Sequence, residues 1–211
     1  MREERIVVAE RELLIIRPDN PESLIDEERF AEDEFMPYWA ELWPSGRALA
    51  DYVATLDLAG RRVLELGCGL ALPSFAAAVA GAAHVIATDW AAEALSLVDR
   101  NAERNGLRIM TALVDWHAPP PSLSGFDVVL TADVLYEERN AVPLLAMLAA
   151  ATCAQGTVLI ADPGRRHAAG FFEGADGDGW SIVNVTTDTL PSGGISILRK
   201  AMSHRPVAVE A

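Results

Sequence analysis

The most constraining feature of this chain is residues 63–89, which read as a strand, a glycine turn, an alanine-rich helix and a second strand. The turn holds Gly67 and Gly69, and the second strand ends on Asp89. Glycine lacks a Cβ, so the backbone can turn tightly and approach a ligand closely. An acid 20 residues after Gly69 can accept hydrogen bonds from the hydroxyls of a ribose. The stretch predicts a nucleoside site and leaves the choice of nucleoside open.

Strands and helices alternate along most of the chain. The apolar runs predict strands near 63–66, 85–88, 110–114, 127–131 and 157–161, and helices near 73–80, 91–104 and 142–151. This alternation predicts an α/β fold, a Rossmann-like and mostly parallel seven-stranded sheet with helices on both faces. After Trp180, two β-branched runs joined by a Pro-Ser-Gly-Gly turn have no helix between them, which indicates a C-terminal antiparallel hairpin.

The N-terminal part has a different pattern. Residues 5–9 and 13–17 predict a short hairpin, and the acidic segment 21–31 predicts a helix. Ser45 is expected to cap a further helix that runs through Leu56. We therefore expect a single domain over 1–211, with N-terminal strands, a helix and a tryptophan segment in 1–45, a Rossmann-like core in 46–202 and a disordered tail in 203–211.

The charge balance limits the partners. Lys and Arg number 17 against 31 Asp and Glu, a net charge of −14. Such a surface repels phosphate backbones and anionic lipids, so we expect no nucleic-acid or membrane partner and favour a basic protein or a cationic small molecule. Two isolated cysteines and four scattered histidines predict no metal site. The N-terminus does not resemble a signal peptide, and a cytoplasmic monomer is expected.

The glycine turn distinguishes two classes of nucleoside cofactor. A dinucleotide fingerprint needs a third glycine, but Leu72 stands there and Pro73 removes an N–H that a pyrophosphate would use. Glu65 would crowd a pyrophosphate, whereas it can pair with the ammonium of an amino-acid-bearing cofactor. These residues favour S-adenosylmethionine. The alternative is a chance glycine turn on an unrelated α/β fold.

Acidic and aromatic residues follow two of the predicted strands. Asp115 can accept the amino group of an adenine, and Trp116 can form a wall beside the ring. Trp90, next to Asp89, can do the same. The alternative is that both tryptophans are rim residues. The cofactor-site prediction comprises Trp43, Glu65, Gly67, Gly69, Asp89, Trp90, Asp115, Trp116 and Ala132.

Three segments carry a resemblance to a known family: the tryptophan segment 37–50, the loop 65–69 and the Asp-x-x-Tyr motif at 133–136. From about Tyr38 to about Arg199 the chain resembles class I seven-strand methyltransferases, in the group often called family 16. Residues 162–165, Asp-Pro-Gly-Arg, resemble the branch that methylates lysines in the β-subunit of electron-transfer flavoprotein, and the glycine loop is similar to that of bacterial members. The resemblance implies a protein-lysine methyltransferase that uses S-adenosylmethionine.

The Asp-x-x-Tyr motif follows an apolar strand, at the edge where open sheets bind ligands. We expect Asp133 to capture and orient the substrate amine, and Tyr136, one helical turn on, to shape the channel. Asp133 could instead cap the next helix. Trp43 could flank the cofactor or the amine, or anchor the N-terminal helix in the core. Asp162, at the end of the next strand, would place a second carboxylate at the same mouth.

Two other functions stay open on the sequence. One is a small-molecule N-methyltransferase on the same fold, and the other is a non-catalytic cofactor-binding scaffold. The paired Asp133 and Tyr136 argue against a scaffold, which has no need of both. Substrate identity and the number of methyl groups transferred do not follow from the sequence.

Overall fold

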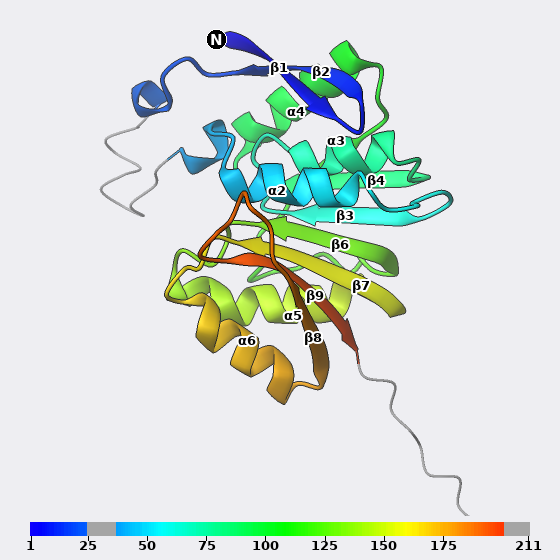
Figure 1. The fold of residues 1–211 in the computed structure, drawn as a ribbon, viewed down its shortest axis with the longest axis vertical. Coiled ribbons are helices and arrows are strands. Elements are labelled where there is room, and N and C mark those ends of the chain that lie inside the picture. Colours follow the sequence, from blue (N-terminus) through cyan, green and yellow to red (C-terminus); the bar gives the residue numbers. More distant parts are fainter. Residues whose placement is uncertain (25–36, 201–211) are drawn as a thin grey trace, which may run out of the picture.

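The central element is a seven-stranded sheet (Figure 1). The computed structural model of the chain describes residues 1–24 and 37–200. In spatial order the strands are β5 (Met110–Leu113), β4 (His84–Asp89), β3 (Arg62–Leu66), β6 (Phe126–Ala132), β7 (Thr152–Asp162), β9 (Gly194–Lys200) and β8 (Trp180–Val185). The strands from β5 to β7 are parallel, and β9 pairs antiparallel with both β7 and β8. The predicted sheet and its C-terminal hairpin are confirmed.

Helices cover both faces of the sheet. On one face lie α2 (Pro44–Val53), α3 (Leu72–Val79) and α4 (Ala92–Asn105), and on the other lie α5 (Ala141–Ala151) and α6 (Ala168–Gly177). Successive strand residues point to opposite faces. Val63 accordingly packs in the core under α2, α3 and α4, while Leu64 packs in the core under α5 and α6.

Helix α6 is not among the helices predicted from the sequence. It holds three glycines in ten residues, a composition that disfavours a helix on local propensity. The burial of Phe171 and Ala175 in the core under α5 and α6 offsets this preference. A pattern search finds α6 poorly because its stability comes from tertiary packing.

The N-terminal hairpin forms a separate two-stranded sheet of β1 (Arg2–Val8) and β2 (Arg11–Arg17), which packs against α4. Two asparagines of α4 bond to the free edge of β2: the amide of Asn101 pairs with the backbone N–H and C=O of Ile16, and that of Asn105 with those of Leu14. Of the predicted acidic helix, only the 3₁₀ turn η1 (Pro21–Leu24) is described; residues 25–31 and the predicted tail lie outside the described residues.

The order of the strands places a crevice at one end of the sheet. The chain moves outward from β3 to β4 and β5, and then returns to the other side of β3 with β6. Open α/β sheets bind ligands beyond the carboxyl ends of the strands at such a reversal. In the described part of the chain, no helix is long and apolar enough to cross a membrane.

Candidate active site

A cavity of about 830 Å³ lies at this reversal, bounded by the loops after β3, β4 and β6 and by the tryptophan segment. Its volume is in the range of pockets that enclose small-molecule ligands. All the residues predicted for the cofactor and for the amine line it, namely Trp43, Glu65, Gly67, Gly69, Asp89, Trp90, Asp115, Trp116, Ala132, Asp133 and Tyr136. Residues spread over more than 90 positions of sequence are thus brought to one cavity.

The glycine loop needs its glycines. Gly67 has a φ of +62°, and a Cβ there would lie 2.9 Å from a methyl group of Val134 and 3.2 Å from the indole of Trp116. Gly69 has a φ of +51°, and a Cβ there would lie 3.1 Å from the carbonyl oxygen of Trp39. The loop is therefore enclosed between the tryptophan segment and the loop after β5, and a side chain at either glycine would collide with these neighbours.

Asp89 fixes this loop from the end of β4. Its carboxylate accepts the backbone N–H of Gly69 at 2.8 Å and that of Ala91 at 3.0 Å. Burial raises the pKa of Asp89, while the two N–H groups act against this shift. Each carboxylate oxygen has a further lone pair, so the same group can accept the hydroxyls of a ribose.

Glu65 lies beneath the loop and is almost fully buried. Its carboxyl group accepts the backbone N–H of Ser74 at 2.9 Å and also the Ser74 hydroxyl, and so it caps the first turn of α3. Burial raises the pKa of Glu65 to about 8. The carboxyl group is therefore poised to ionise when a cation arrives beside it.

The residues predicted for the adenine lie at the outer end of the cavity. Asp115 is exposed, and its Oδ1 accepts the backbone N–H of His117 at 2.8 Å, which lowers the pKa of Asp115. Trp116 lies beside Gly67, whereas Trp90 is 56% exposed. The indole of Trp116 is thus a wall of the cavity and Trp90 lies at its rim.

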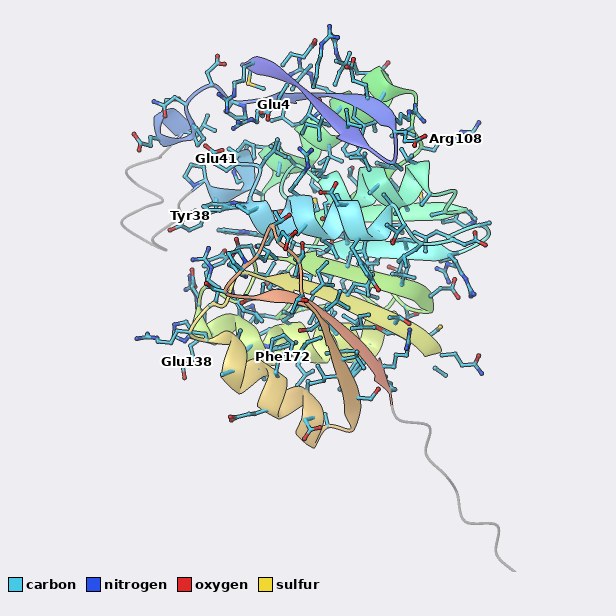
Figure 2. All side chains as sticks on the ribbon, viewed as in Figure 1. Glu4, Tyr38, Glu41, Arg108, Glu138 and Phe172 are labelled. Carbon is cyan, nitrogen blue, oxygen red and sulfur yellow. The ribbon has the colours of Figure 1, made fainter. Side chains whose placement is uncertain are left out.

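Further aromatic side chains line the cavity. Tyr38 lies in the 3₁₀ turn η2 (Tyr38–Ala40), and its ring meets Tyr136 edge-to-face at 5.4 Å and Trp43 at 6.1 Å. The indole N–H of Trp43 donates to the carbonyl of Tyr38 at 2.8 Å. Figure 2 shows Tyr38, Glu41 and Glu138 along the edge toward which the parallel strands point. Tyr38 joins the site through a ring contact that the sequence alone did not predict.

Asp133 has a left-handed backbone conformation, which is uncommon for a residue other than glycine. Its φ is +57°, its N–H donates to the carbonyl of Ala161 at 2.9 Å, and its side chain is buried. Its Oδ1 accepts a hydrogen bond from Arg165 Nε at 2.8 Å, and its Oδ2 lies 3.4 Å from the hydroxyl of Ser45. A non-glycine residue held at positive φ costs about 1–3 kcal/mol and is typical of functional sites.

Two local predictions about these residues are wrong. Ser45 does not cap its helix, because α2 begins at Pro44 with Trp43 in the cap position, and the serine hydroxyl faces Asp133 instead. Asp133 and Tyr136 are not one helical turn apart either: residues 133–137 form a turn that precedes the 3₁₀ helix η3 (Glu138–Asn140). The left-handed backbone at Asp133 keeps this residue itself out of a right-handed helix.

Tyr136 is half-buried beside Tyr38, and burial together with the charge of Glu137 raises its pKa to about 12. The phenol therefore keeps its proton at neutral pH and can donate a hydrogen bond to a neutral amine. Among the residues that the structure describes, no three of the types His, Cys, Asp and Glu gather in a group that could hold a metal ion.

Comparison with known families agrees with this arrangement. A family model described as lysine methyltransferase matches residues 26–176. The chain belongs to this family. The match includes the glycine loop, Asp89 and the Asp133–Tyr136 motif, and ends within α6.

Several curated proteins similar to this chain are named as lysine methyltransferases. The electron transfer flavoprotein beta subunit lysine methyltransferase of Danio rerio is 39% identical over 132 residues, which are 61% of this chain and 51% of that protein. The Homo sapiens protein of the same name is 34% identical over 139 residues, 64% of this chain and 52% of its own length. The chain thus spans about half the length of these relatives.

Solved methyltransferases share the fold. The magnesium protoporphyrin IX methyltransferase of Synechocystis, in a crystal structure with bound SAM, aligns with a TM-score of 0.61 and 18% identity over 84% of this chain and 99% of that one. The ribosomal protein L11 methylase of Lactobacillus delbrueckii aligns with a TM-score of 0.60 and 20% identity over 72% and 77%. At these identities the similarity establishes the fold alone.

Proposed function

We propose that this protein transfers a methyl group from S-adenosylmethionine to the side-chain amine of a lysine in a protein substrate. One observation carries the proposal: a single cavity at the strand-order reversal holds both a nucleoside-type half, with Asp89 and the glycine loop, and an amine-type half, with Asp133 and Tyr136. Family membership supports the reaction class. The printed names of the relatives support a protein substrate.

The donor set of the first half fits S-adenosylmethionine. Asp89 would hold the ribose, Trp116, Asp115 and Trp90 would surround the adenine, and Glu65 would meet the ammonium of the methionine end. Trp43 and Ala132 complete this half of the cavity. When bound, the cofactor supplies a methyl group on a positively charged sulfur. Glu65 is the best test of the fit, because a buried carboxyl group that ionises beside a cation suits this cofactor and not a pyrophosphate.

The second half would receive the lysine. A lysine ammonium has a pKa near 10.4 and must lose its proton before its nitrogen can form a new bond. The carboxylate of Asp133 accepts a hydrogen bond from the amine, and the hydroxyl of Tyr136 donates one to it, so the two residues fix the direction of the amine. The rings of Tyr38 and Trp43 exclude water. Asp133 acts by orientation, because a carboxylate alone would favour the charged amine.

A labelling experiment tests the proposal. The purified protein is incubated with methyl-labelled S-adenosylmethionine and a recombinant electron-transfer-flavoprotein β-subunit, and label in lysine is measured by mass spectrometry. Asp133→Asn is expected to keep its affinity for the cofactor in calorimetry and to lose at least about 100-fold in methyl transfer, because the amine is no longer oriented.

Glu173→Gln is the matched control, since Glu173 is an exposed acid on α6, and it is expected to behave as the wild type. Normal turnover of Asp133→Asn would reduce Asp133 to a structural role. If a cell lysate replaces the β-subunit and label enters small solutes only, the enzyme is a small-molecule N-methyltransferase.

We also propose that the enzyme is a cytoplasmic monomer. Both cysteines, Cys68 and Cys153, are free, as is usual in reducing compartments. Light scattering coupled to size-exclusion chromatography tests the oligomeric state, and a mass near the 22.7 kDa of the chain is expected.

A further inference from the structure

The carboxylate proposed to receive the substrate amine already has a cation of this chain beside it. Arg165 Nε donates to Asp133 Oδ1 at 2.8 Å, across 32 residues of sequence. The Asp133 side chain is 5% exposed and that of Arg165 is 38% exposed. An ion pair in which one partner is buried persists better than an exposed pair, because solvent screens it less.

The backbone of Arg165 is fixed by the loop that follows β7. Asp162 Oδ1 accepts the N–H groups of Gly164 and Arg165 at 2.8 and 2.7 Å. Gly164 has a φ of +92°, and a Cβ there would lie 2.4 Å from the carbonyl oxygen of Ser192. The loop therefore packs too closely against Ser192 to carry a side chain at position 164. These contacts fix the backbone of Arg165, and with it the direction in which its side chain leaves the loop.

Asp133 is fixed from two further directions. Its backbone N–H is held by Ala161 at the end of β7, and the Ser45 hydroxyl of α2 lies 3.4 Å from its second oxygen. With Arg165 on Oδ1, two groups contact the carboxylate, and the end of β7 holds the backbone. It keeps one lone pair on each oxygen for an incoming amine.

The local charges make Arg165 more than a structural contact. Asp162 lies near Asp133, and its Oδ2 is buried without a hydrogen-bond partner among the described residues. Burial raises the pKa of Asp162, and the hydrogen bond to Asp133 raises the pKa of Arg165. Two carboxyl groups thus flank one guanidinium, and without that cation Asp133 would present an uncompensated negative charge to the substrate.

We propose that Arg165 is a positioning residue that orients Asp133 and compensates its charge, so that the substrate amine is held without being kept in its protonated form. This inference rests on the proposed lysine methylation. A free carboxylate favours the ammonium form of a nearby amine, whereas a carboxylate already paired with a cation does so less. The amine therefore releases its proton to water at a lower pH, and the neutral nitrogen is available.

Other ionisable groups face the same region and enter the pH behaviour. They are Tyr38 from η2, Arg47 from α2, Asp89 from the end of β4, Tyr136 from the loop after β6, Asp162 from the end of β7, and Arg165 from the loop after β7. Glu137 and Arg139 pair with each other at the rim and compensate one another. Among the described residues, Arg165 is the only charged group that forms a hydrogen bond with the carboxylate of Asp133, since the other partner, Ser45, is neutral.

The test is the dependence of kcat on pH with the flavoprotein β-subunit as acceptor, for the wild type, Arg165→Ala, Arg165→Lys and Arg166→Ala. For Arg165→Ala the limb that reports amine deprotonation is expected to move up by about one pH unit, with kcat at pH 7.5 about 10-fold lower and KM changed less than about 3-fold. Arg165→Lys keeps the charge and is expected to restore the pH position, though not the full rate, because it lacks the guanidinium geometry. Arg166, the exposed neighbour, serves as the control and is expected to match the wild type.

If the kcat–pH profile of both Arg165 variants rises at the same pH as that of the wild type, the inference is overturned and the proposed function is left intact. No methyl transfer to lysine by the wild type overturns both. If Arg165→Ala fails to fold, as judged by thermal unfolding, Arg165→Gln and Arg165→Lys give the same comparison: the uncharged variant is expected to shift and the charged one is not. An equal shift in Arg166→Ala would also contradict a specific role for Arg165.

Discussion

The carboxyl group of Glu65 illustrates how burial sets the chemistry of a single residue. Both hydrogen bonds described for this carboxyl group come from Ser74. The pKa of Glu65 rises from about 4.5 to about 8 because burial removes the group from water. Between these values the folded protein keeps a proton that the unfolded chain has released. The free energy of unfolding therefore decreases as the pH rises through this window.

This sign gives a prediction for Glu65→Gln. In the absence of cofactor, the wild type is expected to lose thermal stability between pH 5 and pH 8.5 more steeply than the variant, which has no proton to release at this position. Differential scanning calorimetry at several pH values measures the difference. Parallel curves for the two proteins would show that Glu65 ionises normally, and Glu103→Gln on the exposed side of α4 is the control.

For single residues, the sequence predicts which side chains lie in the site better than it predicts which hydrogen bonds they form. All the residues predicted for the cofactor, together with Asp133 and Tyr136, line one cavity, because residues at the ends of parallel strands meet at one edge of the sheet. Asp162, predicted at the same mouth, does not line the cavity and instead accepts the backbone N–H groups of Gly164 and Arg165. The bond of Ser45 to Asp133 and that of Arg165 to Asp133 were not predicted. They join positions 88 and 32 residues apart, and no local pattern encodes such a pairing.

At the scale of elements, the attachment of the N-terminal hairpin to α4 depends on two side chains. The amide of Asn101 is buried and bonds both the N–H and the C=O of Ile16, so it takes the place of a neighbouring strand. Arg17, also buried, pairs with Glu4 inside the hairpin and with Glu41 on the cavity wall, and the second pair connects the hairpin to that wall.

Asn101→Ala is therefore expected to destabilise the protein by about 2–3 kcal/mol, because two backbone groups of β2 lose their partners. Urea denaturation followed by circular dichroism measures this change. Glu103→Ala, on the exposed side of the same helix, is expected to change the free energy of unfolding by less than about 0.5 kcal/mol. A similarly small effect for Asn101→Ala would mean that the hairpin does not depend on this contact.

Most helices and strands follow from their patterns, because buried strands and amphipathic helices carry clear periods. The exceptions have physical reasons. The glycines of α6 conceal a helix that packing stabilises, and α2 begins one residue before the expected cap because proline fits the first turn of a helix. The sequence has no signal for the left-handed backbone at Asp133, which the contacts around it maintain.

The charge of the whole molecule bears on how a substrate arrives. With a net charge of −14, the protein is expected to attract a basic protein over a distance of about a Debye length. The KM for a basic lysine-containing substrate is therefore expected to rise several-fold between about 50 and 300 mM NaCl, while kcat changes little. Steady-state kinetics over this range checks the expectation. A KM independent of salt would show that the charge does not guide the substrate.

The account as a whole depends on the cavity at the strand-order reversal being a site for S-adenosylmethionine. Isothermal titration calorimetry of the wild type and Asp89→Ala with this cofactor tests it most directly, with Glu103→Ala as the control. We expect one site per chain in the wild type and the control, and affinity about 10- to 100-fold lower in Asp89→Ala, since hydrogen bonds to a charged group contribute about 1.5–3 kcal/mol. No binding to the wild type, or equal affinity in Asp89→Ala, would contradict the account.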